Sequence, residues 1–114
     1  MDPAVVPSDE EIRRALVLLK ERIVALLGGS LVKLSLFGSR ARGDFDPDSD
    51  VDVAIVVRDL TPELKSRIFT LVADVELESD VPLSTLVLSE ERFTQLLTGE
   101  RRLALDIERE GIPL

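Results

Sequence analysis

Histidine, cysteine, tryptophan and tyrosine are all absent from this chain of 114 residues. Without histidine, the chain lacks the side chain that most often serves as a general base and zinc ligand. Without cysteine, it can form neither disulfide bonds nor thiolate metal sites. Any acid–base chemistry or metal binding must therefore use carboxylates, and the chain has 22 aspartate and glutamate residues.

The charge balance and the scarcity of aromatic rings restrict the possible partners. A net charge of −8 opposes binding to a nucleic-acid backbone, and four phenylalanines offer few surfaces on which bases could stack. Template-directed polymerisation, and with it a nucleic-acid template, is therefore a poor interpretation. The apolar runs are short and interrupted by charge, so no membrane span is predicted. The start MDPAVVPSDE has no basic leader region, and we expect a cytoplasmic protein.

The pattern of helices and strands predicts one α/β domain over residues 1–114, with helices flanking a mixed sheet of three to four strands. Strands are expected over residues 31–37, 51–57 and 81–88, because these runs are apolar or alternate in polarity. Helices are expected to begin at the capping box Ser8–Glu11, after Thr61 and after Ser89, with a break at Gly99.

The residues best suited to binding or catalysis lie in one stretch, residues 31–57, LVKLSLFGSRARGDFDPDSDVDVAIVV. Gly38 has no Cβ, so the backbone can take a positive φ and a ligand can approach the main chain closely. Ser39 adds a hydroxyl group and an amide. If residues 39–42 begin a helical turn, its free N–H groups point at the Gly-Ser corner, which predicts an anion site with phosphate as the obvious ligand.

Two carboxylates follow at the start of a strongly apolar strand. Asp50 and Asp52 are two residues apart on an extended segment, so their side chains leave the same face, roughly 7 Å apart at the Cα atoms. Such a pair repels itself unless a cation lies between, and carboxylate oxygens suit Mg²⁺ or Mn²⁺. A phosphate corner beside a metal-binding pair indicates phosphoryl or nucleotidyl transfer.

A calcium loop is the rival interpretation of this acidic segment, because Asp46, Asp48 and Asp50 alternate as in an EF-hand. The sixth position of that template would be Val51 rather than glycine, and the twelfth would be Val57 rather than glutamate. We therefore interpret Asp46 and Asp48, together with Asp44, as turn-forming and solvated residues.

The arrangement Gly38-Ser39, ten residues, then Asp50-x-Asp52 resembles the signature of the DNA polymerase beta-like nucleotidyltransferase superfamily. Within it the chain is most similar to the minimal nucleotidyltransferases, which include the MNT-type antitoxins. The resemblance implies a nucleotidyltransferase fold whose first two strands are adjacent and antiparallel. It also implies Mg²⁺-dependent transfer of a nucleoside monophosphate from an NTP to a hydroxyl acceptor.

The resemblance assigns a role to each residue of the motif. Asp50 and Asp52 would hold the metal ions, Mg²⁺ or Mn²⁺. Gly38 and Ser39 would bind the β- and γ-phosphates, and Arg40 and Arg42 would neutralise them. The alternative for the two arginines is ion pairing with the acidic loop, because a guanidinium group suits phosphate and carboxylate equally.

The family pattern is broken at one position. A third carboxylate normally lies on the strand after the long helix, where it helps to hold a metal and takes the proton of the attacking hydroxyl. The matching residue here is Ser84, which is a weak ligand and no base. Asp80, Glu76 or an acid of a partner could replace it.

Three functions follow from the resemblance and its break. The leading one is an antitoxin-like enzyme that modifies a hydroxyl side chain of a HEPN-type toxin, commonly encoded beside it; an oligomer is also possible. The alternative is a degenerate module that binds nucleotide or masks a partner without turnover, which Ser84 favours. Nucleotidylation of a small molecule is weaker, since it normally needs an additional substrate-binding domain.

Overall fold

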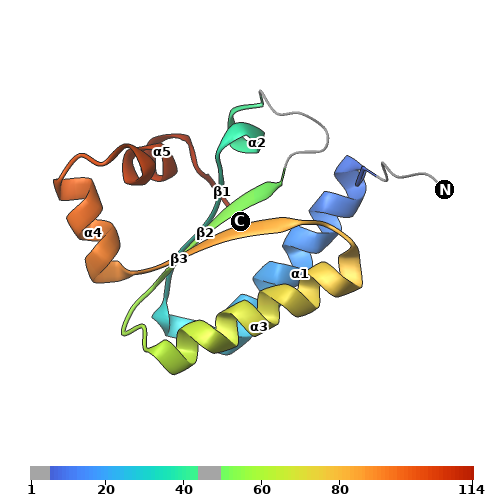
Figure 1. The fold of residues 1–114 in the computed structure, drawn as a ribbon, viewed down its shortest axis with the longest axis horizontal. Helices are drawn as coiled ribbons and strands as arrows, with labels where there is room; N and C mark the ends of the chain where they lie inside the picture. Colours follow the sequence, from blue (N-terminus) through green and yellow to red (C-terminus); the bar gives the residue numbers. More distant parts are fainter. Residues whose placement is uncertain (1–5, 44–49) are drawn as a thin grey trace.

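The computed structural model describes residues 6–43 and 50–114 of the chain. They form a mixed four-stranded sheet with helices on both faces (Figure 1). The elements are α1 (Asp9–Leu27), the 3-10 helix η1 (Gly28–Ser30), β1 (Leu31–Phe37), α2 (Ser39–Arg42), β2 (Val51–Val57), α3 (Pro62–Ser79), β3 (Leu83–Ser89), α4 (Glu90–Thr98), α5 (Arg102–Glu110) and β4 (Ile112–Pro113).

The strand order is β3-β2-β1-β4. β1 runs antiparallel to β2, which confirms the predicted pairing of the first two strands, and β2 runs parallel to β3. Helix α3 makes the long connection that two parallel neighbours require. As a result, the C-terminal end of β1 and the N-terminal ends of β2 and β3 meet at one end of the sheet.

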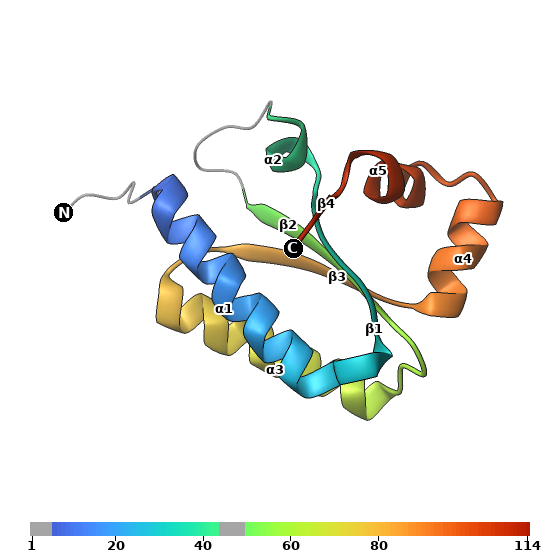
Figure 2. The ribbon, with the colours of Figure 1, turned by 180° about the vertical axis from the view of Figure 1, so that it is seen from behind.

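The central strand β2 is buried on both faces, and its last five residues have no exposed surface. Its odd-numbered residues pack against α1 and α3, whereas Ala54 and Val56 pack against α4 and α5. The second, smaller cluster consists of Ala54, Val56, Phe93, Ala104 and Ile107. Figures 1 and 2 show these two helix pairs on opposite sides of the sheet.

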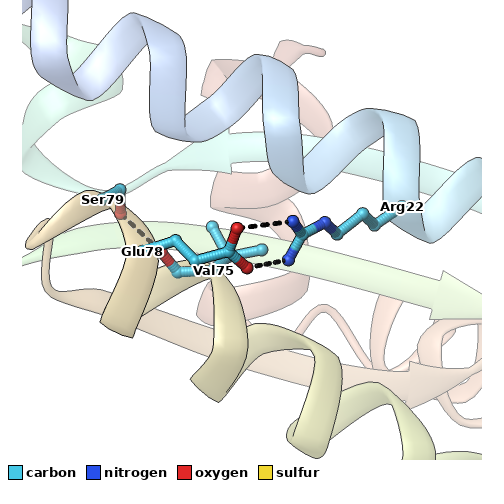
Figure 3. A network of polar contacts seen from close by, with 4 residues as sticks. All are labelled: Arg22, Val75, Glu78 and Ser79. Atoms are coloured by element: carbon cyan, nitrogen blue, oxygen red, sulfur yellow. Dashed lines mark hydrogen bonds and ion pairs between the residues drawn. The ribbon is translucent and has the colours of Figure 1, made fainter.

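Helices α1 and α3 are joined at their surface by an ion pair between Arg22 and Glu78 (Figure 3). The guanidinium group donates to both carboxylate oxygens, with Nη2 lying 2.8 Å from Oε1. This hydrogen bond is the main cause that holds the pKa of Glu78 below its usual value. One residue further on, the Ser79 hydroxyl donates to the Val75 carbonyl at 2.6 Å, where α3 ends.

The ends of the helices follow the sequence closely, because local side chains set them. The capping box of Ser8 and Glu11 is present, and Thr61 caps α3 through a bond from the Leu64 amide. The helical turn on which the predicted anion site depended is present as α2. No helix in the described part of the chain is long and apolar enough to cross a membrane.

Three details differ from the sequence prediction. β3 begins at Leu83 rather than at residue 81, because proline has no N–H to donate and Val81 donates to the Ser79 hydroxyl instead. Leu103 belongs in the sequence to an apolar stripe with Ala104 and Ile107, yet it is 42% exposed while the other two are buried. The short strand β4 was not predicted, since the two residues Ile112 and Pro113 carry no periodic signal.

Replacement of Leu19 by alanine tests the core beneath β2. The side chain is fully buried between α1 and the sheet, so Leu19→Ala should lower the free energy of unfolding by about 2–5 kcal/mol. Val17 on the same helix is 51% exposed, and Val17→Ala should change the free energy of unfolding by less than about 0.5 kcal/mol. Urea unfolding followed by circular dichroism measures both, and equal losses would contradict the assigned face of α1.

Candidate active site

The predicted site residues gather at the end of the sheet where β1 stops and β2 and β3 start. Gly38 follows β1 directly and adopts φ 74° and ψ −156°, a conformation that residues with a side chain rarely take. Ser39 begins the turn α2, which closes through a bond from the Gly43 amide to the Ser39 carbonyl at 2.9 Å. Asp50 lies immediately before β2, and Asp52 is its second residue.

The backbone of Gly38 lies against the carboxylate of Asp52. A Cβ atom placed on Gly38 would be 2.5 Å from Asp52 Oδ2 and 3.3 Å from Asp52 Cγ. Any other residue at this position would push the carboxylate aside. The absence of a side chain at Gly38 therefore allows the corner after β1 and the start of β2 to approach each other.

Asp52 occupies the middle of a row across three strands, with Phe37 of β1 on one side and Ser84 of β3 on the other. The Ser84 hydroxyl donates a hydrogen bond to the Asp52 carboxylate. Burial raises the pKa of Asp52 above its usual value, and the negative charge of Asp50 raises it further. The bond from Ser84 and the positive charges of Arg40 and Arg42 act in the opposite direction.

These effects show that the two acids and the two arginines of the motif share one electrostatic environment. Asp50 is exposed, whereas Asp52 is half-buried. Arg42 also contacts an acid that the sequence gave no reason to select, because its Nη1 atom lies 3.4 Å from Oε2 of Glu110 at the end of α5. The alternative of ion pairs with the acidic loop, and the turns assigned to Asp44, Asp46 and Asp48, fall on residues outside the described part of the chain.

Glu76 and Asp80 are the two acids of this chain that could replace the third carboxylate, and neither joins Asp50 and Asp52. The Glu76 carboxylate accepts a hydrogen bond from the Leu83 amide at 3.1 Å. Asp80 ends α3 with a left-handed φ of 56°. Over residues 6–43 and 50–114, no three acidic residues are placed to hold one metal ion. Ser84 is thus the β3 residue that faces Asp52.

The donor set fits a hard divalent cation that is held only in part by the protein. Two carboxylates supply anionic oxygens, and one of them is desolvated and repelled by the other, so a cation between them would relieve both costs. Mg²⁺ keeps several water or phosphate oxygens when it is bound by one or two carboxylates. The Gly38-Ser39 corner lies directly beside Asp52.

Comparison with known proteins agrees with this arrangement. Residues 16–108 match the family model of the nucleotidyltransferase domain, and the chain belongs to this family. It is therefore an enzyme of the transferase class, as the resemblance of its motif implied.

Two relatives show how far the similarity extends. A protein of Methanocaldococcus jannaschii, named as a candidate protein adenylyltransferase, is 38% identical over 69 residues, which are 60% of this chain and 70% of that protein. The crystal structure of a candidate nucleotidyltransferase from Sulfolobus solfataricus superimposes with a TM-score of 0.50 and 19% identity, over 96% of this chain and 90% of that chain. The second similarity concerns the fold alone.

Alanine at Gly38 tests the contact with Asp52, and Gly43 provides the matched control. Both glycines have a positive φ, so each substitution should cost about 1–2 kcal/mol of stability through backbone strain. Of the two, only the Cβ at position 38 meets another group, since no described residue lies within 4 Å of a Cβ at position 43. Gly38→Ala should therefore shift the ¹³C resonance of the Asp52 carboxyl group and Gly43→Ala should not. An unchanged resonance in both variants would refute the contact.

Proposed function

We propose that this protein transfers AMP from ATP to a hydroxyl side chain of a protein, with Mg²⁺ or Mn²⁺ held by Asp50 and Asp52. The observation that supports this proposal is the packing of the Asp52 carboxylate against the Gly38 backbone. It brings the carboxylate proposed to bind the metal close to the corner proposed to bind phosphate. The choice of ATP and of a protein acceptor is supported by the name of the relative from M. jannaschii.

Each residue of the motif contributes to holding the triphosphate. Gly38 and Ser39 bind the β- and γ-phosphates through the backbone and the hydroxyl group. Arg40 and Arg42 neutralise phosphate charge, and Arg42 exchanges its contact with Glu110 for the phosphate. Asp50 and Asp52 orient the ion, which when bound polarises the phosphate oxygens and neutralises developing charge.

The transfer itself is a substitution at the α-phosphorus of ATP. The acceptor oxygen forms a bond to this phosphorus, the bond from phosphorus to the bridging oxygen of pyrophosphate breaks, and the hydroxyl proton passes to a base. Glu76 is engaged by the Leu83 amide, and Ser84 takes the position of the usual acid. Of the candidates Asp80, Glu76 and an acid of the acceptor protein, we propose the last as the base, because no third acid joins Asp50 and Asp52 among the described residues.

The acceptor proposed is a HEPN-type toxin, which makes this chain an antitoxin-like enzyme. The support is the similarity of its motif to the MNT-type antitoxins, whose partners are commonly encoded in the neighbouring gene. A hydroxyl side chain of the toxin would receive the AMP group.

A second candidate function is a degenerate module that binds nucleotide or masks its partner without turnover. The hydrogen bond from Ser84 to Asp52 favours it, because a hydroxyl group fills the place of the third carboxylate. In the described part of the chain no other acid joins the pair.

Removal of the two carboxylates tests metal-dependent nucleotide binding. The double variant Asp50→Asn with Asp52→Asn should stay folded, because it removes a repulsion, and should bind ATP with Mg²⁺ at least about tenfold more weakly in calorimetry. The control variant Asp59→Asn with Asp74→Asn changes the net charge by the same amount at two exposed acids outside the site. It should bind ATP with Mg²⁺ as tightly as the natural protein does. Equal affinity in all three proteins would exclude the metal site.

Restoration of the third acid separates the two candidate functions. With α-labelled ATP, Mg²⁺ and the neighbouring HEPN-type protein, Ser84→Asp should raise the rate of labelling by about ten- to a hundredfold, at or below the usual effect of a general base. Ser84→Asn has a similar size without the charge and should not raise it. Absence of label with the natural protein and with Ser84→Asp, while ATP binding persists, would establish the binding module instead.

A further inference from the structure

One peptide unit at the start of β3 is held from both sides. It joins Pro82 to Leu83. Its carbonyl group, on Pro82, accepts a hydrogen bond from the Val51 amide at 3.2 Å, and its N–H group, on Leu83, donates to Oε2 of Glu76 at 3.1 Å. The C=O and N–H groups of a planar trans peptide point in opposite directions. Glu76 on α3 and the first residue of β2 are therefore linked through a single rigid group.

The neighbours of this peptide unit belong to the candidate site. Val51 lies between the two site carboxylates and is the ladder partner of Leu83. The next residue, Ser84, is the ladder partner of Asp52 and donates a hydrogen bond to its carboxylate. The orientation of the peptide unit thus sets where β3 begins to pair with β2, and with it the register that places the Ser84 hydroxyl beside Asp52.

Glu76 also fixes the turn that leads into β3. Its backbone carbonyl accepts a hydrogen bond from the Asp80 amide at 2.9 Å, where α3 ends. Asp80 then takes a left-handed φ of 56°, and Pro82 has no N–H group with which to bind an acceptor. The backbone of Glu76 therefore holds one end of the turn and its side chain holds the other.

The sheet offers no substitute for the Glu76 carboxylate. The bond from Val51 to Pro82 fixes the alternation of the parallel ladder, so the N–H group of Leu83 points away from β2. β3 is an edge strand, and no further strand lies on that side among the described residues. Glu76 is half-buried, and a hydrogen bond to an ionised carboxylate is stronger than one to a neutral acceptor.

From these contacts we propose that Glu76 is a positioning residue, which holds Ser84 and Asp52 in register through the peptide unit between Pro82 and Leu83. The inference rests on the proposed function, since it concerns a carboxylate proposed to bind the metal ion. Glu76 itself touches neither the ion nor the nucleotide. It cannot replace the third acid of the family without releasing the Leu83 amide and the start of β3.

Removal of the acceptor at position 76 tests this role without metal or nucleotide. Glu76→Met keeps the length and helix propensity of the side chain but has no oxygen, whereas Glu76→Gln keeps a carbonyl oxygen. Glu76→Met should shift the ¹⁵N resonance of the Val51 amide and the ¹³C resonance of the Asp52 carboxyl group, and Glu76→Gln should restore most of both shifts. The control Glu78→Met removes the ion pair with Arg22 from the same helix and should move neither resonance.

Three results would overturn the proposal. Unchanged resonances in Glu76→Met would show that the bond to Leu83 positions nothing in the site. Equal shifts in Glu76→Met and Glu78→Met would assign the effect to a general loosening of α3. Shifts as large in Glu76→Gln as in Glu76→Met would assign it to the lost charge and not to the hydrogen bond.

Hydrogen exchange of the natural protein decides the question if Glu76→Met does not fold. After correction for intrinsic rates, the Leu83 amide should exchange at least about tenfold more slowly than the Thr85 amide. Both amides point away from β2, but the Thr85 amide has no acceptor among the described residues. Equal exchange rates would refute the contact with Glu76 and the proposal with it.

ATP binding measures the consequence for the site. In calorimetry with Mg²⁺, Glu76→Met should bind ATP at least about threefold more weakly than the natural protein, and Glu76→Gln should bind within about twofold of it. Equal affinity of Glu76→Met and the natural protein would contradict the positioning role. If the natural protein itself fails to bind ATP, the proposed function fails, whereas the resonances and the exchange rates still decide the role of Glu76.

Discussion

Burial of β2 on both faces is the constraint on which the arrangement of this protein depends. A strand covered by helices on each side can carry polar side chains only at its ends, where the layers no longer meet. Asp50 and Asp52 stand at such an end, and the antiparallel neighbour β1 delivers Gly38 and Ser39 to the same place. The strand that stabilises the core therefore also brings two segments of the motif together, ten residues apart in the sequence.

The surroundings of Asp52 make the ionised form of this carboxylate costly. It is partly withdrawn from water, repelled by Asp50, and held between the Gly38 backbone and the Ser84 hydroxyl. Desolvation and repulsion make the ionised form costly, and the two arginines recover only part of that cost. A divalent ion would stabilise this carboxylate more than an exposed one. Its positive charge would offset the electrostatic cost that burial and Asp50 impose on the ionised form.

The replacement of an acid by Ser84 has opposite consequences for binding and for chemistry. A hydroxyl that donates to Asp52 lowers the pKa of this carboxylate and so favours its ionised form, which would suit the proposed cation. It cannot accept the proton of an attacking hydroxyl group, so the base must come from elsewhere. An enzyme that acts on a protein can obtain this base from its substrate, whereas one that acts on water or a small alcohol cannot. The exchange at one residue thus favours a macromolecular acceptor or a protein that only binds.

The sequence by itself determined the elements and the motif, because both depend on local properties. Capping residues set the ends of α1 and α3, the apolar run of β2 marked the central strand, and the spacing of Gly38 and Asp52 marked the site. The pairing of Ser84 with Asp52, the contact of Arg42 with Glu110 and the strand β4 join residues that are far apart in the chain. Only the tertiary structure could decide these, since the register of neighbouring strands and the packing of α5 arise from the collective burial of apolar surface and not from any local pattern.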